Sequence, residues 1–188
     1  MKLIMFHGTS AENANRIEKE GFVADKKYNW NVKSKNGFVY LSSAYAPFYA
    51  MNATKSDKLA LIKVEVDSED CYPEDDFIMS ALGHPKYSQA QLDLVDFEKF
   101  KKFWKESLTY MGNVAVRPDK VKVLGIRIFD GKFLLFKCDP VISQMNFQIM
   151  GKYYGDLSNW IFDGKDIMKF PAFMQEQLEQ LRKESDSK

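Results

Sequence analysis

Three side chains in the first fifty residues could bind and orient a small polar molecule: His7, Tyr40 and Tyr49. His7 follows the apolar run 2–6 and precedes Gly8, so its ring is expected at the end of a strand with open backbone beside it. Tyr40 is expected to end a second strand, and Tyr49 lies on the helix that follows. A tyrosine offers a flat face for stacking and a hydroxyl for orienting a polar group. The three rings together indicate a slot for a flat, polar molecule.

Each of these residues also has a purely structural explanation. A histidine at a strand end can be satisfied by a neighbouring carbonyl group, and a tyrosine at a strand end or on a helix face is commonly part of the core. The spacing of the three rings along the chain, more than any single ring, favours a binding site.

The apolar pattern predicts the elements that would carry these rings. Thr9 or Ser10 is placed to cap a helix that Gly21 ends, because hydroxyl side chains favour the first position of a helix and glycine the last. Ser42 or Ser43 takes the same place before a second helix. The expected ranges are a strand at 2–6, a helix ending at 21, a lysine-rich surface loop at 22–36, a strand at 38–41, a helix from 42 to 53 and a strand at 59–66.

The rest of the chain is expected to add strands and a cover of helices. An acidic turn follows the third strand, and an apolar stripe from Phe97 to Leu108 recurs at helical spacing. Asp130 and Gly131 form a two-residue hairpin signal. The expected ranges are helices at 75–82, 88–111 and 171–183 and strands at 113–117, 121–129 and 132–138, with no assignment for 139–170.

The composition is that of a folded chain with one domain and additions to it. Of the 188 residues, 45% are hydrophobic and 14% aromatic, which is enough for a packed core. Lys and Arg number 27 against 26 Asp and Glu, so the net charge of +1 gives no overall attraction to nucleic acid or to a membrane. We expect a main domain at 1–138 and a C-terminal extension at 139–188 that ends in a helix and packs on the same domain.

Cysteine and histidine usage excludes the common metal and redox sites. Cys71 and Cys138 match no zinc or redox spacing, and the chain has two histidines, too few for a multi-histidine site. The first residues lack a signal-peptide pattern, and no stretch approaches the roughly 20 apolar residues of a membrane span. We therefore expect a soluble, cytoplasmic protein with reduced cysteines and no metal.

The chain resembles the ADP-ribosyltransferase superfamily in three runs: His7-Gly8-Thr9, Tyr40-Leu41-Ser42 and Ala46-Pro47-Phe48-Tyr49-Ala50. The likeness is greatest to the branch of diphtheria toxin and the poly-ADP-ribose polymerases, which carries a histidine, a tyrosine and a glutamate. It covers residues 3–66 well and 113–129 loosely. The resemblance implies an α+β fold with a split mixed or antiparallel β-sheet core, peripheral helices and a C-terminal extension.

The same resemblance implies that the protein uses NAD as a substrate. In the family the histidine of the His-Gly-Ser/Thr element bonds ribose and the glycine backbone holds the nicotinamide carboxamide; His7, Gly8 and Thr9 occupy this element. Tyr40 and Tyr49 correspond to the two tyrosines that sandwich the nicotinamide ring.

Two positions depart from the family pattern. Ala46 stands where a serine often contributes a bond to the carboxamide, so that bond is expected from Ser42 or Ser43. Asn113 stands at the head of the strand where the family has its glutamate, which in the family stabilises the ribose as nicotinamide leaves. Asn113 is therefore the expected third catalytic position, with Glu106 as the nearest upstream acid. Family members that lack the glutamate are often restricted to single transfers or are inactive.

The resulting hypothesis is a mono-ADP-ribosyltransferase that passes ADP-ribose from NAD to a macromolecule, with a protein acceptor favoured over a nucleic acid. Small members of this kind often act as bacterial or phage effectors. The lysine-rich loop from Lys26 to Lys35 is placed to lie over the dinucleotide. Two alternatives remain open: an RNA 2′-phosphotransferase-like enzyme that uses Arg16 and this loop, and a non-catalytic protein that binds NAD, ADP-ribose or a protein partner.

Overall fold

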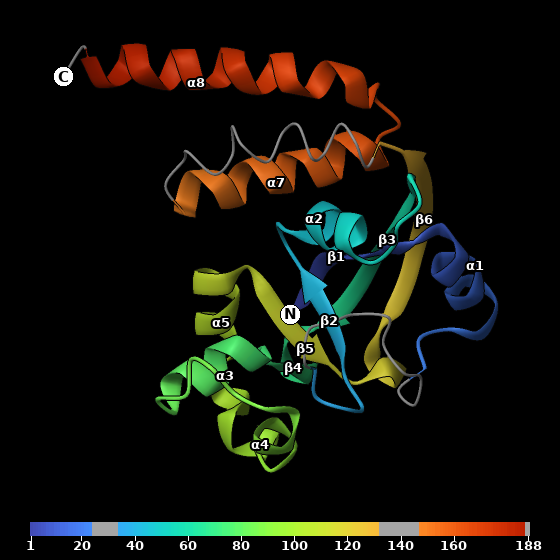
Figure 1. Cartoon of the computed structure of the whole chain (residues 1–188), viewed down its shortest axis with the longest axis vertical. Coiled ribbons are helices and arrows are strands. Elements are labelled where there is room, and N and C mark those ends of the chain that lie inside the picture. The colour runs from blue at the N-terminus through green and yellow to red at the C-terminus, as the bar shows by residue number, and fades with distance from the viewer. Residues whose placement is uncertain (24–33, 132–146, 187–188) are drawn as a thin grey trace.

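The computed structural model describes residues 1–23, 34–131 and 147–186 of the chain. Its strands are β1 (Lys2–Ser10), β2 (Val39–Ser42), β3 (Lys58–Asp67), β4 (Cys71–Tyr72), β5 (Asn113–Val116) and β6 (Lys122–Asp130). Within the described residues they form a six-stranded antiparallel sheet in the order β4-β5-β2-β1-β3-β6 (Figure 1). The fold is therefore mixed α+β.

The first half of β3, from Leu59 to Ile62, is apolar on both faces, because each face packs against its own core. In β3, Leu59 and Leu61 belong to one core, whereas Ala60 and Ile62 belong to the other. Successive side chains of a strand alternate between the faces, so a strand buried on both faces must be apolar almost throughout. β1 pairs with β3 along its whole length, and these two strands form the frame of the sheet.

Helices cover both faces of this frame. They are α1 (Ala11–Glu20), α2 (Ala46–Asn52), α3 (Asp75–Ala81), α4 (Gln89–Asp93), α5 (Trp104–Met111), α7 (Phe147–Phe162) and α8 (Phe170–Asp186). On one face α2 shares a core with Leu157 of α7 and Phe170 of α8, so the C-terminal helices pack on the same core as the first strands (Figure 1). On the opposite face α1 contributes Ala14 and Ile17. α3 and α4 pack beside β4, β5 and β2 around Phe38.

Residues 88–111 do not form the single helix that their apolar spacing predicts. The segment divides into α4, a 3-10 helix from Phe97 to Phe103 and α5, and Asp96 caps the 3-10 helix by accepting a hydrogen bond from the amide of Glu98. The apolar stripe from Phe97 to Leu108 therefore contributes side chains to two different cores. Phe97 packs with Phe38 on the α3 side, whereas Trp104 packs on the α1 side.

The first strand is longer than predicted and contains the residues expected at its end. β1 continues through His7 and Gly8 to Ser10, because its pairing with β3 extends that far. Ser10 caps α1 by accepting from the amide of Asn13, and Gly21 ends the helix with φ of 73°, which confirms both predicted caps.

The predicted cap of the second helix is wrong. α2 begins only at Ala46, after Tyr45, and neither serine caps it. The hydroxyl of Ser42 instead accepts from the amides of Ala44 and Tyr45, at 3.1 and 2.7 Å, and thereby fixes the turn that leads into the helix.

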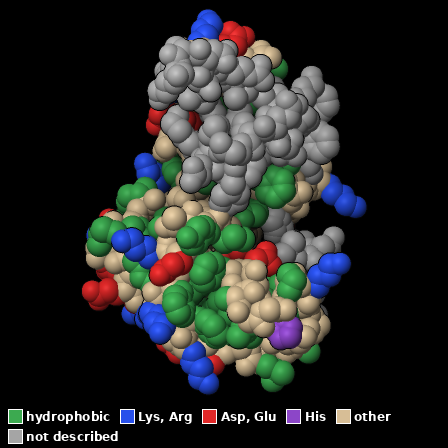
Figure 2. Space-filling view, turned by 90° about the vertical axis from the view of Figure 1, so that its left-hand side faces the viewer, with side chains coloured by type: hydrophobic (Ala, Val, Ile, Leu, Met, Phe, Trp, Pro, Cys, Tyr) green, Lys and Arg blue, Asp and Glu red, His purple; other side chains and the backbone are tan. Residues whose placement is uncertain are grey.

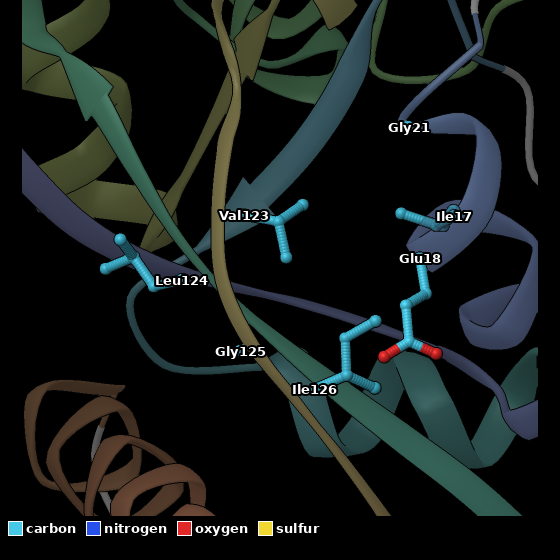
Figure 3. A pocket seen from close by; sticks show the side chains of 7 residues that line it. All are labelled: Ile17, Glu18, Gly21, Val123, Leu124, Gly125 and Ile126. Atoms are coloured by element: carbon cyan, nitrogen blue, oxygen red, sulfur yellow. The ribbon is translucent and has the colours of Figure 1, made fainter.

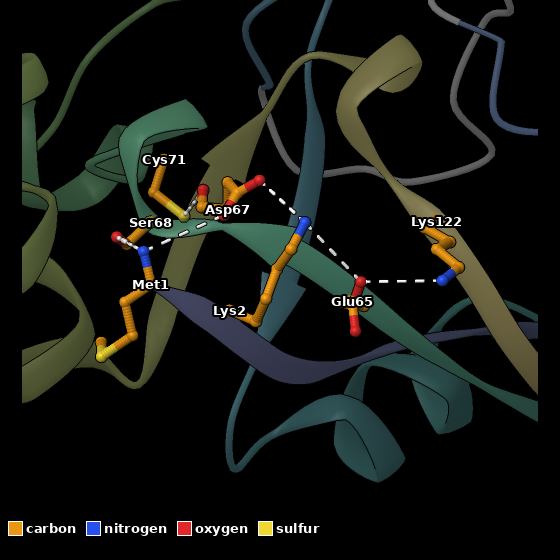
Figure 4. Close-up of polar contacts among 7 residues, drawn as sticks. All are labelled: Met1, Lys2, Glu65, Asp67, Ser68, Cys71 and Lys122. Atoms are coloured by element: carbon orange, nitrogen blue, oxygen red, sulfur yellow. Dashed lines mark hydrogen bonds and ion pairs between the residues drawn. The ribbon is translucent and has the colours of Figure 1, made fainter.

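Polar contacts fix the register where β1 begins and β3 ends (Figure 4). Nζ of Lys2 lies 2.8 Å from Oδ2 of Asp67 and 3.7 Å from a carboxylate oxygen of Glu65, which also faces Lys122. These pairs are solvent-exposed or nearly so, and their contribution to stability is small. The Cys71 thiol beside them is buried, and burial first, then neighbouring acids, raise its pKa to about 12, so it stays protonated and unreactive.

No helix in the described part of the chain has both the length and the apolar composition needed to cross a bilayer. Two predicted segments, most of the lysine-rich loop (24–33) and the return strand at 132–138, lie outside the described residues.

Candidate functional site

The sheet is interrupted between β1 and β2. Among the described residues the ladder between these strands consists of one pair, Phe6 with Ser42, although β1 is paired throughout with β3 on its other side. Continuing the antiparallel register places Gly8 level with Tyr40, and no ladder joins the strands there. We call this stretch the β1–β2 break. Among the described residues, the backbone edge of β1 has no strand partner in this stretch.

His7 spans the β1–β2 break. Its Nδ1 lies 3.0 Å from the carbonyl oxygen of Tyr40, and because a carbonyl oxygen only accepts, Nδ1 must carry the hydrogen. Burial lowers the pKa of His7, although this hydrogen bond opposes the shift, so the ring is neutral at pH 7 and Nε2 is an acceptor. The ring meets Phe22 edge-on at 5.2 Å between centroids, which keeps it on the α1 side of the sheet.

Gly8 is required by the close approach of α2. A Cβ atom at this position would lie 1.8 Å from the carbonyl oxygen of Ala46 and 2.8 Å from the amide nitrogen of Ala50. Both contacts are backbone atoms in the helix, so no rotamer change relieves them. The helix, rather than a ligand, explains why a glycine stands here.

Tyr49 and Asn113 are in direct contact on the opposite face from His7. Asn113 begins β5 and pairs with Ser42, and its Nδ2 donates to the hydroxyl oxygen of Tyr49 at 2.6 Å. Burial first, then the charge of Glu74, raises the pKa of Tyr49, so its hydroxyl stays protonated. The structure thus brings together two of the predicted site residues that lie far apart in the sequence.

Tyr40 lies on the same face as Asn113, because Tyr40 pairs with Ala115 and side chains two apart on a strand share a face. Its hydroxyl donates to Oδ1 of Asp75 and accepts from the amide of Lys35 at 2.9 Å. Among the ring contacts of the described residues, Tyr49 meets Phe48 and not Tyr40, so the two tyrosine rings are not stacked on each other.

Lys35 makes hydrogen bonds both to Asp75 and to the end of α4, beside Tyr40. Its amide also reaches Oδ2 of Asp75, at 3.2 Å, and its Nζ donates to three carbonyl oxygens at the end of α4. These belong to Leu92, Asp93 and Val95, at 3.2, 2.6 and 2.9 Å. The ammonium group of Lys35 therefore holds α4 in place and is engaged within the fold, although the loop that contains it was expected to lie over the dinucleotide.

A buried serine connects Asn113 to an acid that the sequence analysis did not select. Ser107 of α5 is fully buried, and its hydroxyl donates to the carbonyl oxygen of Asn113 and accepts from the amide of Glu74, both at 3.0 Å. Continuing the β4–β5 register from Tyr72 and Ala115 places Glu74 level with Asn113. Glu74, which lies between β4 and α3, is therefore a neighbour of Asn113 at the start of β5.

Glu74 and Asp75 are buried carboxyl groups. Burial first, then the charges of Asp76 and Asp75, raises the pKa of Glu74 to about 8. Burial also raises the pKa of Asp75 to about 7, although the hydrogen bonds from Tyr40 and from the Lys35 amide oppose that shift. Two carboxyl groups that titrate near neutral pH beside a tyrosine and an asparagine are typical of a functional site.

These two groups are expected to make the protein less stable at alkaline pH. Their folded-state pKa values of about 8 and about 7 lie above the ordinary 4.5 and 3.8, so the folded state binds more protons than the unfolded state between these limits. The stabilisation is complete below the unfolded pKa values and is lost as the pH rises through about 8. Denaturant titrations should show the free energy of unfolding falling by up to a few kcal/mol from about pH 5 to about pH 9. Glu74→Gln should flatten that profile, and a profile that rises over this range would contradict the buried acids.

Removal of the Ser107 hydroxyl is expected to destabilise the fold by about 1–3 kcal/mol, because it leaves a buried amide and a buried carbonyl without their partner. The measurement is the free energy of unfolding of Ser107→Ala. Thr109→Ala, on an exposed part of the same helix, is the control and should change that energy by less than about 0.5 kcal/mol. Equal effects of both substitutions would show that the Ser107 bridge is not formed.

Two predicted ligand contacts are used within the fold. Besides accepting from two amides, the hydroxyl of Ser42 donates to the carbonyl oxygen of Gly112 at 3.2 Å, which exhausts its hydrogen-bonding capacity. Thr9 is buried, and its hydroxyl accepts from Nδ2 of Asn13 at 2.7 Å. Ser42 therefore serves the turn before α2, and Thr9 anchors α1.

The remaining charged candidates lie away from the Tyr49–Asn113 contact. Glu106, the predicted substitute acid, is exposed in the first turn of α5, because its neighbour Ser107 faces inward. Arg16 donates to Oδ1 of Asn13 on α1. In the described part of the chain, no three His, Cys, Asp or Glu side chains are grouped as metal ligands would be.

Two features of the surface can be compared with the position of the predicted site. Figure 2 looks onto the side of the molecule that carries α3 and α5, and it shows hydrophobic side chains gathered in the middle of this face with acidic and basic side chains beside them. On the α1 side a shallow groove runs between Ile17 to Gly21 and residues Val123 to Ile126 of β6 (Figure 3). None of the predicted site residues lines that groove.

Comparison of the chain with models of known protein families, with curated protein sequences and with solved structures gave no match. A functional assignment therefore depends on the residues and the geometry. Its main features are the Tyr49–Asn113 hydrogen bond, the β1–β2 break beside His7, and the buried carboxyl group of Glu74.

Proposed function

We propose that the protein is an NAD-dependent mono-ADP-ribosyltransferase that transfers ADP-ribose to a macromolecule, and that its sheet is the split sheet of the ADP-ribosyltransferase fold. The observation that carries this proposal is the hydrogen bond of 2.6 Å between Asn113 and Tyr49. This bond joins Asn113, the first residue of β5, to Tyr49 on α2, and the resemblance assigns both positions to one site. The break in the ladder between β1 and β2 supports the proposal, because a split sheet is expected of this fold.

The residues around the break fit successive groups of a dinucleotide. The neutral ring of His7 offers Nε2 as an acceptor for a ribose hydroxyl on one side of the sheet. The backbone of Gly8 lies at the break, where the carboxamide of nicotinamide would bind. Tyr40 and Tyr49 occupy the positions whose rings would flank the nicotinamide ring on the other side. NAD is long enough to meet both sides, because it contains two nucleotides.

The reaction breaks the bond between C1′ of the ribose and N1 of the nicotinamide ring. The electron pair of that bond leaves with nicotinamide, which becomes neutral, and positive charge develops on the ribose. A nucleophilic atom of the acceptor then forms a bond to C1′ and loses its proton to the surroundings. Groups that hold the ribose and exclude water lower the barrier of such a dissociative step.

Nicotinamide release tests this proposal most simply. Purified protein is incubated with NAD carrying a label on the adenylate half, together with cell lysate, and nicotinamide and labelled macromolecules are measured. We expect nicotinamide release and label that remains on a protein band after denaturation. Label on nucleic acid would show that the acceptor is a nucleic acid and would still support the transfer reaction. NAD that is left intact would contradict the proposal.

A further inference from the structure

Two buried oxygen atoms near Tyr49 have no hydrogen-bond partner. They are Oε1 of Glu74 and Oδ1 of Asn113, and neither is satisfied within the described structure. The residues are 8% and 5% exposed, so neither oxygen atom faces bulk solvent. A buried polar atom without a partner is unfavourable by about 1–3 kcal/mol, so its presence in a folded protein requires an explanation, and a catalytic role is one.

The two oxygen atoms belong to neighbouring positions on the same face of the sheet. The β4–β5 register places Glu74 level with Asn113, and the hydroxyl of Ser107 holds their backbones together. The charge of Glu74 acts on the hydroxyl of Tyr49, which Asn113 contacts directly. Glu74 therefore lies beside Asn113 and Tyr49, although it comes from the segment between β4 and α3 and not from the head of β5, where an acid was first expected.

The chemistry of these atoms indicates what they would bind. The amide oxygen of Asn113 only accepts hydrogen bonds, and the carboxyl group of Glu74 only accepts once it has lost its proton. A ligand that satisfies both atoms in that state must supply donors. The two neighbouring hydroxyl groups of a ribose are such donors. A carboxylate also stabilises the positive charge that a ribose acquires as nicotinamide leaves.

We propose that Glu74 is the catalytic carboxylate of the transfer reaction and that, together with Asn113, it binds the hydroxyl groups of the nicotinamide ribose. This inference rests on the proposed function, because it assigns a residue to the reaction of the same site. The Glu74 carboxylate accepts a hydrogen bond from the ribose and faces the positive charge at C1′ while the C1′–N1 electron pair leaves with nicotinamide. The carboxylate is unchanged when the acceptor has formed its bond to C1′. The asparagine at the head of β5 therefore does not leave the site without an acid.

The test compares Glu74→Gln with Glu106→Gln, which removes an exposed acid from the first turn of α5. Glutamine keeps the size of Glu74 and removes its charge. We expect nicotinamide release by Glu74→Gln to fall by about 100-fold or more in kcat, as for the loss of one charge-stabilising group, while Glu106→Gln stays within about twofold of the wild type. NAD binding measured by calorimetry should persist in Glu74→Gln, which separates a loss of chemistry from a loss of the fold.

The pH profile adds a readout that a merely structural role would not move. Wild-type kcat/KM should rise with pH as Glu74 loses its proton, and the Glu74→Gln profile should lack that rise. If the wild type releases nicotinamide and Glu74→Gln does so at a similar rate, the assignment of Glu74 is wrong and the proposed function stands. If the wild type releases none, both the function and the assignment of Glu74 fail.

Discussion

Gly8→Ala should destabilise the protein by about 3 kcal/mol or more, which lowers the melting temperature of a chain of this size by roughly 6–12 °C. The added methyl group would lie 1.8 Å from the carbonyl oxygen of Ala46, and that oxygen is part of the helix backbone. Relief requires α2 to move away from β1 as a whole. Such a movement opens the core that α2 shares with α7 and α8.

Gly83→Ala separates this steric effect from a general effect of replacing glycine. Gly83 has φ of 79°, and nothing lies within 4 Å of the position of its Cβ. Its replacement should therefore cause only backbone strain, about 1 kcal/mol. Thermal and denaturant unfolding of both variants measure the difference. An equal loss of unfolding free energy in the two variants would contradict the close packing of α2 on β1.

His7→Ala is expected to lower kcat/KM for nicotinamide release by about 100-fold or more while leaving most of the stability of the fold. Among the described residues, the ring makes one hydrogen bond, to the carbonyl oxygen of Tyr40, so its removal should reduce the free energy of unfolding by about 1 kcal/mol. The larger loss is expected in the reaction, because Nε2 is the acceptor available at the β1–β2 break for a ribose hydroxyl.

The matched control is His84→Ala. His84 is the other histidine of the chain and lies exposed after α3. Steady-state nicotinamide release should be unchanged in this variant. A His7→Ala enzyme that keeps its activity and loses several degrees of thermal stability would make His7 a purely structural residue.

Most of the strands could be predicted from the sequence, because a buried strand appears there as a run of apolar residues. β3 and β5 follow the expected ranges closely, since both are buried on their two faces. The end of β1 was missed because His7 to Ser10 resembles a loop in isolation. Only its pairing with Leu59 to Ile62 of β3 makes it a strand, and that pairing joins distant parts of the chain.

The sequence analysis selected only those residues of the candidate site that a short motif or the family resemblance indicates. His7, Tyr40, Tyr49 and Asn113 were selected from their spacing and resemblance, whereas Glu74 was read as part of an acidic turn. Consecutive acids usually lie in water. Glu74 is buried because Ser107 of α5 binds its amide, and a lone serine inside a helix gives no signal of such a contact. Its one sequence clue is its position directly after the alternating strand that becomes β3 and the short β4.

A crystal structure of the protein with NAD bound tests the central claim most directly. The account predicts the nicotinamide ring against Tyr49, with ribose hydroxyl groups within hydrogen-bonding distance of Oδ1 of Asn113 and Oε1 of Glu74. NAD bound instead in the groove between α1 and β6, or absent at saturating concentration, would contradict it.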